Sequence, residues 1–341
     1  MDIKNFKIEL DKNSIQLLKI SDEEYFSEKY SHYISNSKLK LINPLENGSI
    51  ELFLSDEKNE YNPSLEFGTA IHQLILQSND YKLLDYNYKP SGKLGSFIES
   101  LVKYRKLKYK IWEAAVKASN DSNYYKNKLT IKLFKNALKN GLKYYLDLYY
   151  DKLKSDDNKE NVIVPNNILE SVKKILKSYD DFEYKYFTHS ENSYNEYAIF
   201  VDFLVTINEK NIKIPFKLKI DNFYIDDINK TIILNDLKTT SNQVDFFMGY
   251  KYYDEFDEEY KGYLGSFQKL HYYRQLAIYI YILQQIYGQD YKYFTNIIAI
   301  SSKNDCSLLY VPVQNAYIKK GLNEFNELLY LVAKYKLLNN E

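Results

Sequence analysis

The stretch KIDNFYIDDINKTIILNDLKTT, residues 219–240, decides the fold because it holds two β-rich runs joined by a polar turn. The runs NFYI and TIILNDL contain β-branched and aromatic residues, and DINK between them has the composition of a hairpin turn. Side chains two residues apart in a strand share a face, so Asp236 and Lys238 project together while Leu237 points to the other side. We therefore predict a hairpin whose second strand ends in charged side chains.

The two aspartates of this stretch, Asp221 and Asp236, are candidates for a shared site. We expect Asp221 to end the preceding long strand and to lie beside Asp236 across the sheet. Two carboxylates and the Lys238 ammonium would then converge, and the like charges repel unless a divalent cation lies between them. A structural Asp–Lys pair is the other interpretation, and the hairpin by itself leaves both open.

The regions around the hairpin predict an α/β protein, a mixed central sheet flanked by helices, with a helical insertion. No internal repeat or long linker is visible, so we expect a single domain over 1–341. Its expected parts are a helical N-terminal segment (1–60), a helical, basic insertion (97–180), a sheet with one long helix (194–310) and a C-terminal helix (314–341).

The composition limits the class of protein. A chain of 341 residues with 45% hydrophobic residues can bury a full core. The lone Cys306 excludes a disulfide framework and a four-cysteine metal site within the chain, and fits a reducing compartment. The longest apolar stretch, LAIYIYIL (276–283), is far below the ~20 residues that a membrane span needs. We expect a soluble, intracellular protein with no membrane partner.

The basic residues are unevenly distributed, although 46 Lys+Arg balance 46 Asp+Glu. Twelve of them lie between Leu101 and Lys143, where only two residues are acidic. There KYRKLKYK (103–110) interleaves tyrosines with cations, as is typical of surfaces that neutralise phosphates and stack on bases. A solvated helix face is the alternative. The chain has only two arginines, Arg105 and Arg274. Either their presence is due to chance, or these two positions need the planar guanidinium that lysine lacks.

Two further helices carry polar side chains among apolar ones. FGTAIHQLIL places His72 four residues after Gly68, and such a histidine is by itself more often a satisfied core residue. A helix from about residue 266 places Gln275 and Tyr279 at i and i+4, on one face, with Arg274 beside them. An ordinary amphipathic core helix is the alternative there.

Taken in order, these segments resemble the PD-(D/E)XK nuclease superfamily, and most closely its phage-type exonuclease VIII (RecE-like) and RecB-like branch. That family has a G-x-x-x-H helix, then an acidic residue, a D-L-K-T-T strand and a Q-x-x-x-Y helix. The early YISNSKLKLINP is also similar to the family's N-terminal S-x-S-x-L-K-x-L segment. The matching elements, within roughly 30–285, are Gly68–His72, Asp221, Asp236–Thr240 and Gln275–Tyr279.

The resemblance implies a restriction-endonuclease-like core and a DNA nuclease that uses Mg²⁺ or Mn²⁺. Lys238 would orient or activate the attacking water, and the helix residues would steady a phosphate. The implied residues are His72, Asp221, Asp236 and the carbonyl of Leu237 for the metal; Lys238, Asp236, Asp221, Glu196, Gln275 and Tyr279 for catalysis; and Lys103, Arg105, Lys106, Lys108 and Arg274 for the nucleic acid.

The sequence departs from the family in two places. Ile220 replaces the proline of the family name, and the upstream glutamate is ambiguous, with Glu196 preferred over Glu191 because it opens the strand YAIFVDF. Neither departure removes an implied metal ligand.

The function expected from the resemblance is that of a phage or mobile-element exonuclease in a bacterial cytoplasm, which resects linear double-stranded DNA for recombination or replication. Its expected partners are DNA, further copies of the chain in a closed oligomer, and a single-strand annealing protein. Two rivals are open: a structure-specific or packaging-related endonuclease, or the nuclease part of a helicase–nuclease; and a catalytically silent DNA-binding scaffold.

Overall fold

The protein forms two compact units in the computed structural model, which describes residues 6–55, 63–84, 89–153, 159–254, 259–303 and 305–339. The sheet unit comprises residues 1–57, 182–302 and 307–341, and the helical unit comprises 58–181 and 303–306. This division differs from the single domain that we expected, because the helices of the insertion bury a core of their own.

The sheet unit is built on a six-stranded sheet in the order β1-β4-β5-β6-β9-β10. All neighbours pair antiparallel except β6 and β9, which are parallel. This mixed sheet, with helices packed against it, confirms the predicted fold class. The strands are β1 (Phe6–Leu18), β4 (Ser193–Ile207), β5 (Lys210–Asp226), β6 (Thr231–Thr240), β9 (Lys292–Ser301) and β10 (Leu308–Pro312).

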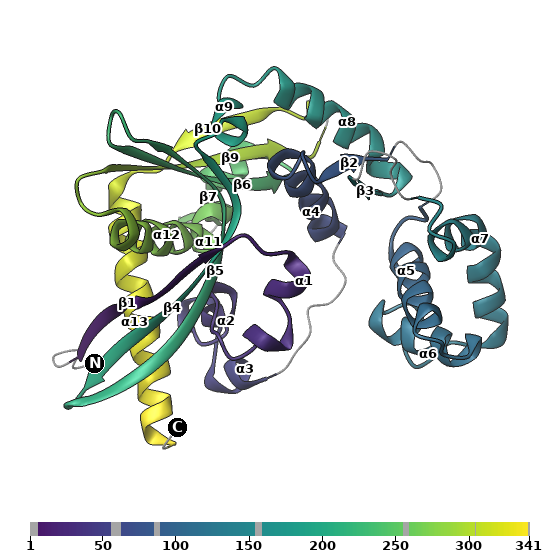
Figure 1. Cartoon of the computed structure of the whole chain (residues 1–341), viewed down its shortest axis with the longest axis horizontal. Helices are drawn as coiled ribbons and strands as arrows, with labels where there is room; N and C mark the ends of the chain where they lie inside the picture. The colour runs from purple at the N-terminus through teal and green to yellow at the C-terminus, as the bar shows by residue number, and fades with distance from the viewer. Residues whose placement is uncertain are drawn as a thin grey trace. The chain divides into compact units, whose positions relative to one another are not determined.

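Two long helices, α12 (Tyr272–Tyr287) and α13 (Asn315–Leu338), cover one face of this sheet, and Figure 1 shows α13 crossing β4 and β5. Alternate residues of β4 face them, with Phe203 buried against Phe325 of α13. Phe200 points to the opposite face, where it packs against Tyr30. This alternation follows from the two-residue period of a strand.

Short elements complete the sheet unit. They are α1 (Asp22–Tyr25), the 3₁₀ turns Glu28–Tyr30 and Pro44–Glu46, α2 (Asn36–Lys40), α3 (Ile50–Leu54), α9 (Tyr186–His189), α10 (Gln243–Phe247), α11 (Ser266–Lys269) and the hairpin of β7 (Tyr250–Asp254) with β8 (Glu259–Tyr263).

The helical unit has its core between α5, α6 and α7, where Phe97, Leu101, Ala118 and Tyr144 are buried together. The expected insertion at 97–180 falls in this unit and includes one short strand. No helix in the described ranges is long and apolar enough to cross a membrane. The elements are α4 (Pro63–Leu76), β2 (Tyr81–Leu83), α5 (Lys93–Lys106), α6 (Ile111–Asp121), α7 (Ile131–Tyr149), β3 (Glu160–Val162) and α8 (Asn166–Asp180).

Two local expectations were wrong. The first described element of the segment 1–60 is strand β1 and not a helix, because Phe6, Ile8 and Leu10 alternate with polar residues and pair with β4. Asp221 does not end a strand either. Strand β5 continues through it to Asp226, so NFYI belongs to the same strand as NIKIPFKLKI.

A ladder of buried asparagine side chains fixes the register of four strands. Asn222 of β5 donates from Nδ2 to Oδ1 of Asn195 in β4 at 2.7 Å, and Asn235 of β6 donates to Oδ1 of Asn222 at 2.7 Å. Asn296 of β9 donates to Oδ1 of Asn235 at 3.2 Å. Both central members are fully buried, so a one-residue slip of either central strand would leave polar groups unpaired in the core.

Asn235→Ala is expected to lower the free energy of unfolding by about 1–3 kcal/mol, because it removes one hydrogen bond from each of the buried amides of Asn222 and Asn296. Urea denaturation followed by circular dichroism measures the change. Asn13→Ala, at an exposed position of β1, is the control and should stay within about 0.5 kcal/mol of the wild type. Equal stability of the two variants would contradict a register-fixing ladder.

Candidate functional site

Asp221, Asp236 and Lys238 meet on the sheet face opposite the asparagine ladder. Asn222 pairs with Asn235, so the adjacent aspartates of β5 and β6 lie side by side. The Lys238 Nζ lies 2.6 Å from Oδ2 of Asp236 and 3.9 Å from Oδ2 of Asp221. Asp236 is almost fully buried. The structure thus brings the two carboxylates and the ammonium together, and their role in a site stays a prediction.

The backbone of Leu237 joins this cluster although its side chain is buried in the core. Its N–H donates to Oδ2 of Asp221 at 2.8 Å, and its carbonyl accepts from the Lys238 Nζ at 3.3 Å. The first of these bonds holds Asp221 beside β6, just beyond the last pair of residues that the two strands form.

Glu196 of β4 brings a third carboxylate to the same place. Its neighbours pair with the residues on either side of Asp221, and the two carboxylates approach within 4.8 Å. Its φ of 56° lies in the left-handed region, an unusual and strained conformation for a residue in a strand. The Lys219 Nζ lies 2.7 Å from Oε2 of Glu196 and 2.5 Å from Oδ1 of Asp22, so these two carboxylates hold a second ammonium at the site.

Gln275 and Tyr279, which their spacing placed on one helix face, lie one turn apart on α12 and approach the carboxylates. Gln275 donates from Nε2 to Oδ1 of Asp236 at 3.3 Å and to the Tyr279 hydroxyl. The Tyr279 hydroxyl donates to the carbonyl of Lys219 at 2.7 Å. Burial, and after it the charges of Asp236 and Asp221, raise the pKa of Tyr279 well above its ordinary value, so the phenol stays a hydrogen-bond donor.

Lys238 is a charged ammonium in this arrangement. Burial by itself would lower the pKa of its side chain, but the carboxylates of Asp236 and Asp221 outweigh burial and raise that pKa above its ordinary value. The Lys238 Nζ also lies 5.1 Å from the centre of the Tyr272 ring. Lys238 can therefore donate hydrogen bonds and stabilise negative charge.

Arg274 does not take part in this site, which corrects its expected role in phosphate binding. Only 1% of it is exposed, and its Nη1 pairs with Glu46 at 2.7 Å and with Glu324 of α13. Its Nε donates to Oδ1 of Asn36 at 2.8 Å. Consecutive helix residues point in different directions, so the neighbour of Gln275 faces the core and not the carboxylates.

The other predicted residues lie in the helical unit. His72 is on α4, and its part in the site stays a prediction. Lys103, Lys106 and Lys108 are exposed near the end of α5, although Lys106 pairs with Asp151. Arg105 is half-buried and donates to the Tyr109 carbonyl. Tyr104 and Tyr109 pack edge to face on each other, with ring centres 5.6 Å apart.

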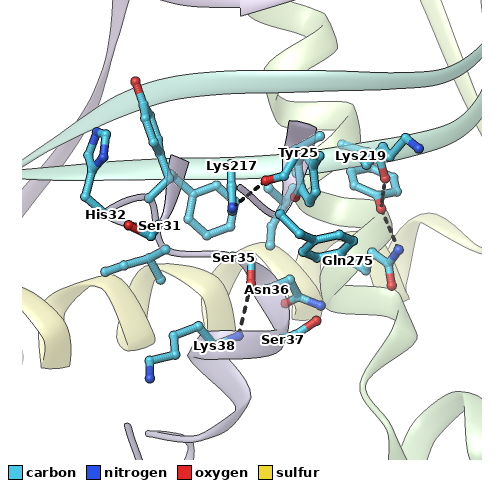
Figure 2. Close-up of a pocket in the computed structure, with 17 residues that line it drawn as sticks. Tyr25, Ser31, His32, Ser35, Asn36, Ser37, Lys38, Lys217, Lys219 and Gln275 are labelled. Carbon is cyan, nitrogen blue, oxygen red and sulfur yellow. Dashed lines mark hydrogen bonds between the residues drawn. The ribbon is translucent and has the colours of Figure 1, made fainter. Parts of the chain in front are cut away.

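A pocket of about 480 Å³ adjoins the Gln275–Tyr279 face. Figure 2 shows Lys217 and Lys219 from β5 on one side of it, and Ser35 with the first residues of α2, Asn36 to Lys38, on the other. The first four residues of the S-x-S-x-L-K segment thus line the pocket, while Leu39 is buried in the core. Neither lysine of β5 was predicted as a site residue, although their two-residue spacing before Asp221 is that of side chains on one strand face.

Comparison with known proteins found no matching family model and no similar curated protein. The chain is similar to the crystal structure of a "Putative exonuclease" from Eubacterium rectale, with a TM-score of 0.47 and 13% identity over 93% of this chain and 87% of that one. Protein VC1899 from Vibrio cholerae gives a TM-score of 0.15 and 10% identity over 82% of this chain and 57% of that one. Both scores are low, so the geometry of the site carries the functional conclusion.

Glu196→Gly is expected to be more stable than Glu196→Ala by about 1 kcal/mol, because glycine adopts a positive φ without the steric cost of a Cβ. Both variants lose the carboxylate and leave Lys219 paired with Asp22. The difference in stability between them therefore measures the cost of the backbone conformation alone. Thermal and urea unfolding measure the difference. An alanine variant as stable as the glycine variant would show that the left-handed conformation stores no strain.

Proposed function

We propose that the chain is a metal-dependent deoxyribonuclease that hydrolyses DNA phosphodiesters and acts as an exonuclease on linear double-stranded DNA. The observation that supports this proposal best is the convergence of Glu196, Asp221 and Asp236 with Lys238 on one sheet face. Carboxylates that close to each other, beside a charged lysine, are suited to binding a cation and to stabilising a phosphoryl group that gains negative charge.

The residues at the site fit a divalent cation. Three carboxylates, those of Glu196, Asp221 and Asp236, face two ammonium groups, so negative charge is in excess even before the exposed Asp22 is counted. Carboxylate oxygens are the ligands that Mg²⁺ and Mn²⁺ prefer. Asp221 and Asp236 would hold the ion with the Leu237 carbonyl, and Glu196 approaches Asp221 within 4.8 Å. When bound, the ion would neutralise phosphoryl oxygens and lower the pKa of a bound water.

The protein's own donors would orient the reacting groups. As a charged ammonium, Lys238 cannot accept a proton, so we assign it to holding the attacking water and to stabilising the negative charge of the transition state. The amide of Gln275 and the hydroxyl of Tyr279 would fix the carboxylates and the backbone of β5 around the scissile phosphate. These contacts position groups in advance and lower the entropy cost of the reaction.

The helical unit would supply much of the DNA affinity. Because the whole chain has no net charge, attraction to phosphates must come from local patches, and the segment from Leu101 to Lys143 is the most basic one identified. A closed oligomer around DNA and a single-strand annealing partner stay predictions from the resemblance.

Asp221→Asn, Asp236→Asn and Lys238→Ala are each expected to lower the cleavage rate by about 10²–10³-fold or more, since each removes charge stabilisation at the reacting phosphate. The assay is digestion of linear DNA with a 5′ or 3′ label in Mg²⁺, Mn²⁺ or EDTA, beside covalently closed circles. Asp290→Asn, which alters an exposed carboxylate of the sheet unit, is the control.

Near-native turnover by any of the three site variants would refute the assigned site. Cleavage of closed circles as fast as linear DNA would refute the exonuclease and favour an endonuclease. Absence of hydrolysis by the wild type in either metal would leave a DNA-binding scaffold as the better description.

Replacing Lys103, Lys106 and Lys108 together by alanine is expected to weaken duplex binding and to flatten its salt dependence. Each lost phosphate contact should reduce the log–log salt slope by about 0.9 on duplex DNA. Fluorescence anisotropy at a series of salt concentrations measures the slope. The matched control replaces three exposed lysines of α13, Lys319, Lys320 and Lys334. If both triple variants keep the wild-type slope, the segment is only a solvated helix face.

A further inference from the structure

The pocket beside Gln275 and Tyr279 has the lining of an anion-binding site. Among the described residues no Asp or Glu lines it, although the chain contains 46 of them. Serine hydroxyls and lysines line it instead, and Figure 2 shows Lys217 and Lys219 of β5 above and the segment from Ser35 to Lys38 below. The polar lining residues are Ser31, His32, Ser35, Asn36, Ser37, Lys38, Lys217, Lys219 and Gln275, together with the tyrosines Tyr25, Tyr33 and Tyr279.

Lys217 is the most informative of these residues. Only 7% of it is exposed, and its Nζ donates to the carbonyl of Tyr25 at 2.9 Å and lies 4.7 Å from the centre of that ring. No carboxylate in the part of the chain that the structure describes pairs with it, and burial lowers the pKa of its ammonium. A buried ammonium without a carboxylate is costly, and an anionic ligand in the pocket would offset that cost.

Lys38 adds a second ammonium that no described carboxylate balances. It comes from the opposite wall, where its Nζ donates to the carbonyl of Ser55 at 3.1 Å and lies 5.4 Å from the centre of the Phe53 ring. Lys219 differs, because Asp22 and Glu196 already neutralise it. The uncompensated positive charge therefore lies at Lys38 and Lys217.

Aromatic rings stand at the same pocket. Phe26 is 74% exposed, an unusual state for a phenylalanine, and it packs edge to face on Tyr25 with ring centres 4.9 Å apart. Tyr33 and His32 also line the pocket, with ring centres 4.4 Å apart. Exposed rings beside unpaired cations are the combination by which proteins hold an unstacked nucleotide, the ring against the base and the cation against the phosphate.

We propose that this pocket binds one nucleotide of the strand that is cut, with its phosphate at Lys217 and its base against Phe26. The inference rests on the proposed function and adds a source of end preference to it. The pocket has the volume of a small-molecule site and is far too small for a duplex, so the nucleotide must leave its base pair to enter. Unpairing costs least at a strand end, which favours linear DNA over closed circles.

The test uses a short duplex with 2-aminopurine, a base whose fluorescence rises on unstacking, at the terminal or at an internal position. Binding is measured in EDTA, so no cleavage occurs. Wild-type protein should raise the emission of the terminal probe several-fold and leave the internal probe unchanged. Phe26→Ala and Lys217→Met should remove this rise, and loss of the stacking partner should weaken binding about tenfold.

Phe294→Ala is the matched control, because Phe294 is 53% exposed on β9 of the same unit and does not line the pocket. Phe26 is exposed, so its variant tests the pocket without risk to the core. Equal emission from terminal and internal probes, or equal behaviour of the two phenylalanine variants, would overturn the proposal. Full competition by inorganic phosphate, with no effect of Phe26→Ala, would also overturn it and leave a simple anion site.

Hydrolysis in Mg²⁺ by the same samples separates the two proposals. If the protein unstacks the terminal base but does not cleave the DNA, the result supports the nucleotide pocket and contradicts the nuclease assignment. If the protein cleaves linear DNA without unstacking the base, the result supports the nuclease assignment and contradicts the nucleotide pocket.

Discussion

The register of β4, β5 and β6 is the constraint on which the candidate site depends. The buried asparagine ladder and the carboxylate cluster occupy neighbouring residues on opposite faces of the same strands: Asn222 follows Asp221, and Asn235 precedes Asp236. A shift by one residue would exchange the two faces, so that the carboxylates would take the buried positions of the asparagine ladder. Fixing the amide ladder therefore also fixes the distances between the charged groups.

The cluster keeps its charges at a cost to stability. Asp236 is nearly fully buried, and the ammonium of Lys238 and the amide of Gln275 offset part of its desolvation. The backbone at Glu196 adds strain, since its φ is positive in the middle of a strand pair. Strain and buried charge at the same few residues are typical of functional sites, where the surrounding fold holds an arrangement that is unfavourable by itself.

The start of α12 is held by a second buried ionic network. Arg274 joins Glu324 of α13 to Glu46, and His271 and Tyr273 also contact the Glu324 carboxylate. Because Gln275 follows Arg274 directly, these bonds hold the helix turn that faces the carboxylates. The same guanidinium binds Asn36, so it also supports the α2 wall of the pocket. Arg274 thus supports both the α12 turn and the α2 wall of the pocket, although it contacts neither the carboxylate cluster nor the pocket lysines.

What the sequence determined by itself was the local geometry. The two-residue period placed Asp236 and Lys238 on one face, and the i, i+4 spacing placed Gln275 and Tyr279 on another, because these periods are properties of the backbone. The pattern of runs also predicted the α/β class correctly. Only the tertiary structure decided which side chains are buried and what they contact. Arg274 pairs with a glutamate 50 residues away, and Lys217 reaches a carbonyl 192 residues away. The continuation of β5 through Asp221, the strand at β1 and the left-handed Glu196 likewise depend on neighbouring strands, which no local pattern specifies.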